Sequence, residues 1–188
     1  MKQKTPTVLY ISGLGDQYDG FRRLCLVLWP HTKLVPMKWF SSEDFAAKLL
    51  RLKSEITKYD EVILVGESAG ATMVLHIAEE NPRNVIRYAT LCGVCSQVIP
   101  IHPRLKLRSP AFEKATRSLN GSYHLEKLHH FRAWHDPVVT KKYSSVEGAK
   151  VTTIVSVGHF FTIFLCLSVY APWFMYKLRK TRLDFLAR

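Results

Sequence analysis

Short apolar runs alternate along this chain with longer amphipathic stretches, and this alternation restricts the fold more than any other feature. The apolar runs are rich in β-branched residues and predict six strands, at residues 7–12, 33–39, 61–65, 85–91, 130–134 and 151–156. The other stretches predict helices at residues 21–29 and 69–80, one after capping residues 41–44 that ends near residue 58, and helical turns at 111–119. Strands separated by helices form parallel sheets. We therefore expect an α/β fold with three α/β/α layers and a mostly parallel sheet of about six strands.

The length of 188 residues predicts one domain, residues 1–188. Hydrophobic residues make up 47% and charged residues 22%, which is typical of globular chains and excludes disordered and disulfide-stapled classes. No repeat, low-complexity segment or interdomain linker interrupts the pattern. Residues 96–110 contain three prolines and predict a loop without regular structure over one edge of the sheet.

The charge is strongly positive and unevenly placed. The formal net charge is +12, of which residues 101–188 carry +10 and residues 1–100 carry +2. Such a surface attracts phosphate-rich partners, either anionic lipid or nucleic acid. The basic residues of the second half are scattered without a recognition motif, which argues against nucleic acid and favours a solvated basic face: Arg104, Lys106, Arg108, Arg117 and Lys127.

The most specific motif is Gly66-Glu67-Ser68-Ala69-Gly70, which matches G-x-S-x-G and joins a predicted strand directly to a predicted helix. A strand-to-helix turn this tight exposes the serine hydroxyl and leaves room only for glycine at its two ends, Gly66 and Gly70. It also places Ser68 at a helix N-terminus, where amide N–H groups stabilise a developing oxyanion. We interpret Ser68 as a nucleophile. The alternative is a plain glycine-rich turn with an incidental serine.

A serine hydroxyl needs a base to become a nucleophile, and the base needs a partner that orients it. Asp136 follows the predicted strand at residues 130–134, and His159 follows the one at residues 151–156. Ligands bind at the carboxyl edge of parallel strands, where both side chains would lie near Ser68. The competing residues are Asp16 and Asp19 for the acid and His129, His130 and His135 for the base, while Glu67 would face solvent or brace the turn.

The turn at Ser68 and the chain order Ser68, Asp136, His159 resemble the α/β-hydrolase family, from residue 7 to about the end of the chain. The resemblance implies that Ser68 is the nucleophile and that His159 is the general base and acid. It implies that Asp136 is the carboxylate that orients His159. The implied fold is a minimal α/β-hydrolase fold.

The resemblance also implies an oxyanion hole formed by the N–H groups of Ala69 and of Leu14, which lies in the loop after the first strand. That loop reads Ser12-Gly13-Leu14-Gly15, where the family usually has a His-Gly turn. The chain also lacks the two antiparallel strands that usually open this fold. It has little room for a lid, so we expect an exposed site.

The expected function is that of a small esterase-like serine hydrolase that cleaves a carboxylic ester through an acyl-enzyme on Ser68. A thioester, a lipid acyl chain or a peptide are further substrate classes, and neither a metal nor an organic cofactor is needed. Two alternatives stay open. One is a hydrolase-fold binding or membrane-associated protein with a silent site, and the other is an acyltransferase that uses the same residues.

Cys92 and Cys95 form a C-x-x-C pair. A redox pair of this type normally lies at a helix N-terminus, whereas this one follows a strand and precedes a proline-rich segment. A zinc site needs two further ligands, of which His102 supplies at most one. We therefore interpret both cysteines as small buried thiols.

The C-terminal region is unusually apolar, because residues 151–176 contain no Asp, Glu, Lys or Arg. If residues 151–156 form the last strand, a helix over residues 160–176 would span roughly 25 Å, less than a hydrocarbon core of about 30 Å. Ala171-Pro172 would also break it, so we expect no membrane span. The helix from about residue 160 closes the fold, and its outer face, with the basic tail at residues 177–182, folds back as core or contacts a partner chain or an anionic membrane surface.

The first six residues lead directly into a predicted strand, without the apolar stretch and cleavage site of a signal peptide. We expect a cytoplasmic protein, with peripheral membrane attachment as the second location. In that compartment the four cysteines, Cys25, Cys92, Cys95 and Cys166, would be reduced.

Overall fold

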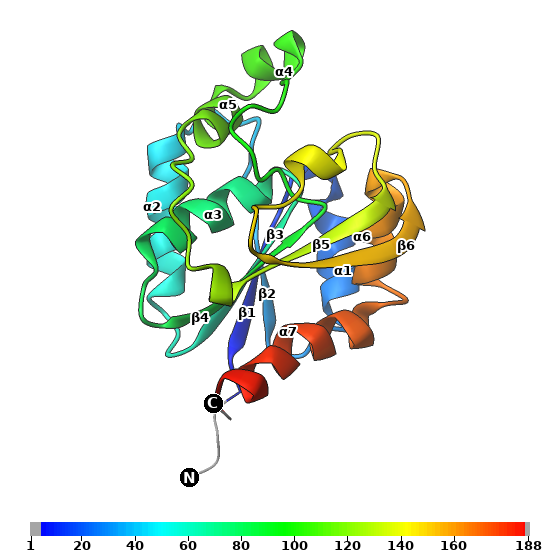
Figure 1. Ribbon diagram of the computed structural model, residues 1–188. Helices are drawn as coiled ribbons and strands as arrows, with labels where there is room; N and C mark the ends of the chain where they lie inside the picture. Colours follow the sequence, from blue (N-terminus) through cyan, green and yellow to red (C-terminus); the bar gives the residue numbers. More distant parts are fainter. Residues whose placement is uncertain (1–4, 187–188) are drawn as a thin grey trace.

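A six-stranded sheet organises the structure. The computed structural model describes the backbone of residues 5–186 and the side chains of residues 5–180. The strands are β1 (Thr7–Ile11), β2 (Thr32–Val35), β3 (Val62–Glu67), β4 (Val85–Leu91), β5 (Leu128–His135) and β6 (Lys150–Val157). They are all parallel and lie in the order β2-β1-β3-β4-β5-β6 (Figure 1). The predicted parallel sheet of about six strands is confirmed.

Helices cover both faces of this sheet (Figure 1). One layer contains α1 (Asp19–Leu26), α6 (His159–Leu167) and α7 (Ala171–Leu186), and the other contains α2 (Phe45–Ile56), α3 (Gly70–Glu80) and α5 (Pro110–Arg117). Successive strand residues point to opposite layers: Leu9 packs with the α2 and α3 layer, and Tyr10 packs with the α1 and α6 layer. The three predicted α/β/α layers are therefore present.

The strand order reverses at β1, which lies between β2 and β3. The chain passes from β1 through α1 on one face to β2, and then through α2 on the other face to β3. The loops that follow β1 and β3 therefore diverge at the carboxyl edge of the sheet. In parallel sheets ligands bind at a reversal of this kind, at the carboxyl ends of the strands.

The prediction that residues 96–110 contain no regular structure was wrong for the short helix α4 (Pro103–Arg108). Pro103 is the first residue of that helix and Pro110 is the first residue of α5. Proline is tolerated there because the first turn does not use its own N–H groups. The ring of His102 completes the start of α4 by accepting the N–H of Arg104 through Nδ1 at 3.2 Å. Single 3-10 turns occur at Asp16–Tyr18, Leu125–Lys127 and Lys141–Tyr143.

The predicted second strand is shorter than expected, because β2 ends at Val35 and Pro36 follows it. Met37 and Trp39 are nevertheless fully buried against the α2 and α5 layer. The indole of Trp39 donates to the carbonyl of Ser12 at 3.0 Å. The apolar pattern at residues 37–39 thus reflects a loop that packs into the core.

The apolar C-terminal region forms two helices, α6 and α7, and α7 begins at Ala171-Pro172, where the sequence predicted a break in a helix over residues 160–176. The two are bent by 80° at a short break, and Pro172 lies in the first turn of α7. Within the described residues no single helix is long and apolar enough to cross a membrane. The bent pair of α6 and α7 meets that criterion by its combined length and composition. Both pack on the sheet through Ile163, Cys166 and Phe174. The side chains of the predicted basic tail beyond residue 180 lie outside the described residues.

Candidate active site

The turn between β3 and α3 has the geometry that the G-x-S-x-G motif predicts. Only Ser68 and Ala69 connect the two elements, and Ser68 has a φ of +50°, which residues other than glycine rarely adopt. A Cβ atom on Gly66 would lie 2.6 Å from the carbonyl oxygen of Gly70, and one on Gly70 would overlap the carbonyl oxygen of Ile11. Both glycines are required by this close backbone packing. It holds Ser68, which is partly exposed, at the carboxyl edge of the sheet.

His159 and Asp136 form a hydrogen-bonded chain with Ser68. His159 Nε2 lies 2.9 Å from Ser68 Oγ, and His159 Nδ1 lies 2.7 Å from Asp136 Oδ2. Asp136 follows β5 and His159 begins α6 directly after β6, so both lie at the same sheet edge as Ser68. The carboxylate can only accept, so in the neutral ring Nδ1 carries the proton and Nε2 accepts the serine hydroxyl. The structure thus brings together the three side chains that the sequence singled out.

The carboxylate of Asp136 is held on both of its oxygens. Oδ2 faces His159, while Oδ1 accepts the N–H groups of Val138 at 2.8 Å and Val139 at 2.9 Å. Burial alone would raise the pKa of Asp136, but the hydrogen bond and charge of His159, together with the two backbone N–H groups, lower it below its usual value. Asp136 is therefore ionised and fixed in orientation at neutral pH.

The two predicted oxyanion donors come from two segments at the carboxyl edge of the sheet. Ala69 precedes the first residue of α3, and Leu14 lies in the loop after β1. A Cβ atom on Gly13 would lie 2.8 Å from Ser68 Cβ, so this loop rests directly against the turn. Among the described residues, neither the N–H of Leu14 nor that of Ala69 donates a hydrogen bond to any group. Both are thus available to an anionic oxygen.

A buried ion pair, which the sequence interpretation missed, lies beneath the turn. Glu67 is buried and accepts from Arg22 Nη2 at 2.5 Å and from the hydroxyl of Tyr10 at 2.6 Å. Arg22 also donates to the carbonyl oxygens of Gly15 at 2.9 Å and Leu14 at 3.3 Å. Burial would lower the pKa of Arg22, but the hydrogen bond and charge of Glu67 outweigh it and raise that pKa. Arg22 therefore stays charged and ties the loop after β1 to the turn.

The sequence contains a signal for this pair. Arg22 lies three, four and seven residues before the apolar Cys25, Leu26 and Trp29, which is the spacing of one helix face. An arginine on the buried face of a covering helix requires a buried acidic partner. Of the two environments predicted for Glu67, solvent exposure was wrong, and bracing of the turn is what the structure shows.

The competing acids and histidines have other partners. Asp16 accepts the N–H groups of Trp39 and Phe40, and Asp19 pairs with Arg22. His129 and His130 are buried within β5, where they contact threonine hydroxyls, and His135 is exposed. None of these side chains contacts Ser68 or His159 through a hydrogen bond in the described part of the chain.

Cys92 lies beside the hydrogen-bonded chain. Its Sγ and ligand atoms of Asp136 and His159 all lie within 4.8 Å of one another. The donor set does not favour a metal, because both nitrogens of His159 and both oxygens of Asp136 are already bonded. Burial, reinforced by the charge of Asp136, raises the pKa of the Cys92 thiol and keeps it protonated. Cys95 is likewise a buried free thiol, as predicted for both.

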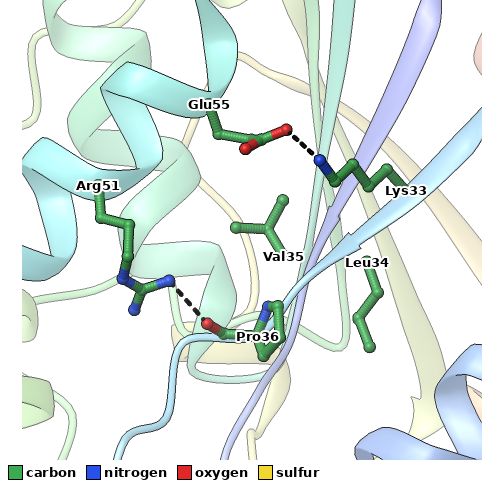
Figure 2. A pocket seen from close by; sticks show the side chains of 6 residues that line it. All are labelled: Lys33, Leu34, Val35, Pro36, Arg51 and Glu55. Atoms are coloured by element: carbon green, nitrogen blue, oxygen red, sulfur yellow. Dashed lines mark hydrogen bonds and ion pairs between the residues drawn. The ribbon is translucent and has the colours of Figure 1, made fainter.

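A hollow of about 160 Å³ lies beside the edge strand β2, between β2 and α2 (Figure 2). Its lining includes Lys33, which binds Glu55 at 2.7 Å, and Arg51, which donates to the carbonyl of Pro36 at 2.9 Å. Figure 2 shows that these charged groups are directed toward their own partners. None of the predicted site residues lines this hollow, so it is separate from the candidate site at Ser68.

No protein-family model matches the sequence, and no curated protein matches it. Several solved structures are similar to this chain. The pyrethroid hydrolase PytH is similar, with a TM-score of 0.65 and 12% identity over 94% of this chain and 98% of that one. A structure reported for the metagenome-derived lipolytic enzymes LipS and LipT has a TM-score of 0.65 and 9% identity, over 94% and 93% of the two chains.

Est1E from Butyrivibrio proteoclasticus has a TM-score of 0.64 and 14% identity, over 98% of this chain and 90% of that one. Identities this low establish a shared fold and nothing about substrates. The order of the strands, the strained turn at Ser68 and these neighbours lead to one conclusion. The chain has the α/β-hydrolase fold, in a minimal form with six parallel strands.

Proposed function

We propose that the protein is a serine hydrolase that cleaves carboxylic esters through an acyl-enzyme. The observation that carries this proposal is the pair of distances at His159, 2.9 Å to Ser68 Oγ and 2.7 Å to Asp136 Oδ2. A nucleophile, a base and an orienting carboxylate in hydrogen-bond contact are the requirement for acyl transfer by serine. The fold alone would not support this function, because one fold carries many activities.

In the first half of the reaction Ser68 Oγ attacks the ester carbonyl carbon while its proton moves to His159 Nε2. The carbonyl oxygen becomes an oxyanion, which the N–H groups of Leu14 and Ala69 stabilise. The imidazolium that forms is stabilised by the ionised Asp136. When the tetrahedral intermediate collapses, the C–O bond of the ester breaks, and His159 returns the proton to the departing alcohol.

In the second half a water molecule attacks the acyl carbon and gives its proton to His159 Nε2. The bond to Ser68 Oγ then breaks, the serine takes the proton back, and the carboxylic acid leaves. Each step uses only these side chains, the backbone donors and water. The proposed reaction therefore involves no metal or organic cofactor.

The surroundings of the site favour an apolar acyl group. Phe160 follows His159, and its ring packs edge-on against the imidazole, with 5.4 Å between the ring centroids. Trp134 and Val138, which lie close to Asp136 in the chain, are largely exposed. Apolar side chains that are exposed beside a nucleophile offer contact area to an acyl chain. Among acyl compounds we therefore place esters with an apolar acyl group first.

The test is covalent labelling with a fluorophosphonate probe, followed by mass-spectrometric mapping of the modified residue. We expect one modification, at Ser68, and none in Ser68→Ala. The same two proteins are then assayed with p-nitrophenyl esters of increasing chain length. We expect Ser68→Ala to lose at least about 10⁴-fold in kcat while its thermal unfolding stays unchanged.

Two outcomes would replace this proposal with the other functions considered. Absence of both labelling and turnover in the folded wild type would indicate a binding protein with a silent site. Labelling at Ser68 with transfer of the acyl group to an added alcohol or thiol, faster than to water, would indicate an acyltransferase. Equal labelling of Ser68→Ala would remove Ser68 from the mechanism.

A further inference from the structure

The outer side of α1 is apolar, although this helix already covers the sheet with an apolar inner side. Leu24 is 71% exposed and Val27 is 80% exposed, while Trp29 on the inner side is buried. The outward residues are spaced three and four apart, and they lie on α1 (Phe21 and Leu24) and in the turn that follows it (Val27 and Leu28). A covering helix usually presents polar residues to water, so these exposed apolar residues require an explanation.

The exposed apolar residues continue onto α6. Phe160, Phe161 and Phe164 are exposed on that helix, and the ring of Phe164 stacks on that of Phe21, with 5.7 Å between the centroids. The two helices thus share one surface, here called the apolar face: Phe21, Leu24, Val27, Leu28, Phe160, Phe161 and Phe164. Large apolar side chains gathered in this way mark interaction surfaces.

The apolar face reaches the candidate active site. His159 is the first residue of α6, and Phe160 belongs to the apolar face while it packs against the ring of His159. A hydrophobic phase that covered the apolar face would therefore lie next to Ser68. An acyl chain could pass from that phase to the serine without crossing water.

The charges on this side of the molecule are almost all positive. In the described parts of α1, α6 and α7 the only acidic side chain is Asp19, which is paired with Arg22. Arg23 is exposed one turn before Val27. On α7, Lys177 lies over the ring of Trp173 and Lys180 over that of Tyr176. Lysine beside tryptophan or tyrosine is typical of membrane–water interfaces.

We propose that the apolar face docks on the surface of an anionic phospholipid membrane. The apolar side chains of α1 and α6 would enter the boundary of the acyl chains, and Arg23, with the lysines of α7, would contact headgroup phosphates. A second copy of this chain fits the surface less well. It would place two molecules of net charge +12 with their basic helices together, whereas anionic lipid satisfies the apolar and the charged groups at once.

The protein lies on this membrane and does not cross it. The α6 and α7 pair is apolar enough to span, but its inner side chains, such as Ile163 and Phe174, are packed on the sheet. The docking does not depend on the proposed hydrolysis. The docking also assigns a substrate class, an ester whose acyl chain is held in the membrane. This assignment, unlike the docking, rests on the proposed function.

The test measures binding of Ser68→Ala, which cannot consume lipid, to vesicles by flotation. Vesicles of phosphatidylcholine alone are compared with vesicles that contain about 30% phosphatidylserine, at about 0.1 M and about 0.5 M salt. We expect binding to the anionic vesicles that weakens at high salt, and little binding to neutral ones. Failure of the proposed hydrolysis would leave this result unchanged.

Variants then locate the surface. Leu24→Gln with Val27→Gln should lower the partition coefficient at least about tenfold, because both side chains leave the lipid. Leu50→Gln with Leu107→Gln is the matched control, since these two leucines are 66% and 84% exposed on α2 and α4, and it should bind as the parent does. Arg23→Gln should weaken binding about fivefold at low salt.

Three results would overturn the proposal. The first is absence of binding to anionic vesicles. The second is equal binding by the Leu24→Gln, Val27→Gln variant and its control. The third is a dimer of the parent protein in light scattering that the apolar-face variant, but not the control, dissociates, because the apolar face would then be an interface between copies.

Discussion

The nucleophile half of the candidate site is built differently from the acid–base half. The nucleophile half lies on the central strands β1 and β3. There Ser68 is fixed by close backbone packing at Gly66 and Gly70 and by the buried pair of Arg22 and Glu67. These contacts belong to the core of the protein, so disturbing them also disturbs the fold.

The acid–base half lies on loops at the edge of the sheet, after β5 and β6. Its geometry depends on hydrogen bonds of these segments, such as that from the N–H of Gly158 to the carbonyl of His135 at 2.8 Å. The hydroxyl of Thr162 donates to the carbonyl of Gly158 at 2.7 Å. In the described part of the chain β6 is an edge strand that pairs with β5, and its residue Val155 is exposed. Side chains here can change while the core remains intact.

The two halves should differ in how their substitutions affect turnover and stability. Substitutions in the acid–base half should abolish turnover with little loss of stability, whereas substitutions in the nucleophile half should lower both. A site in which both halves responded alike would contradict this distinction.

The largest expected effect is that of Asp136→Asn on turnover. The N–H groups of Val138 and Val139 select the amide oxygen, so the new NH₂ group faces His159 Nδ1. The ring must then carry its proton on Nε2 and can no longer accept that of Ser68. We expect kcat to fall roughly 10⁴-fold, with thermal unfolding close to that of the wild type.

The matched control is His135→Asn, which changes an exposed neighbour. It should retain the wild-type rate in the same ester assay. If Asp136→Asn kept more than a tenth of the wild-type kcat, Asp136 would not be the orienting acid.

The next effect is that of Arg22→Met, which acts on the nucleophile half. Glu67 would stay buried without its cation, so we expect a loss of about 3–5 kcal/mol in the free energy of unfolding. The carbonyls of Leu14 and Gly15 would also lose their donor, and the loop that carries the Leu14 N–H would move. We expect kcat to fall about tenfold to a hundredfold with KM little changed.

Urea unfolding and ester kinetics measure the two effects separately. Arg23→Met is the control, because Arg23 is the exposed neighbour, and its stability should change by less than about 0.5 kcal/mol. Adding Glu67→Gln to Arg22→Met removes the buried charge and should restore part of the stability but not of kcat. Joint recovery of both would show that Arg22 affects turnover only through folding.

A third substitution tests the backbone packing of the nucleophile half. Gly70→Ala places a methyl group against the carbonyl oxygens of Ile11 and Ser12, and we expect it to destabilise the protein by about 3 kcal/mol. Gly20→Ala is the control, since no atom lies within 4 Å of its added Cβ and the residue is helical. It should be neutral or stabilise by up to about 1 kcal/mol. Equal urea midpoints for both variants would contradict the packing argument.

The sequence was sufficient to predict the parts of the site that follow from local pattern. Ser68 was recognisable from its glycines, and Asp136 and His159 from their positions after predicted strands. In a parallel sheet those positions meet at one edge, so no long-range contact had to be known. The oxyanion assignment of Leu14 and Ala69 came from resemblance, and it stays a prediction.

Features that depend on which side of an element faces inward could not be fully predicted. Apolar residues occupy both sides of the predicted helix at residues 21–29, so the pattern did not show that Leu24 and Val27 are exposed. The spacing of Arg22 to Cys25 and Leu26 indicated an inward position, but it did not identify Glu67 as the partner. Met37 and Trp39 suggested a longer strand because loop and strand residues both pack into the core. Pro103 suggested an irregular loop because proline ends helices as well as beginning them.

The last expected effect is a change in the pH dependence of stability, and it concerns two buried histidines at the start of β5, away from the loops of the acid–base half. The N–H of Val146 donates to His130 Nε2 at 3.2 Å, so Nδ1 carries the proton toward Thr90 Oγ1 at 2.7 Å and the ring is neutral. Burial, and then the charge of Arg132, lowers the pKa of His130 to about 4. Burial, and then nearby cations led by Lys150, lowers the pKa of His129 to about 3.

Both histidines have an ordinary pKa near 6.5 when unfolded, so between pH 6.5 and 4 the unfolded chain binds more protons. Their contribution to stability is therefore present above pH 6.5 and is lost as the pH falls, by about 1.4 kcal/mol per pH unit for each ring. Asp136 contributes at a lower pH than the histidines. Because its pKa in the folded protein is lowered, its contribution to stability is present above its unfolded pKa of 3.8 and is lost as the pH falls below it. Urea unfolding between pH 7 and pH 4.5 should show the combined slope. His130→Gln, which can still accept from Val146 and donate to Thr90, should roughly halve it. An unchanged slope would mean that His130 does not contribute to the pH dependence of stability.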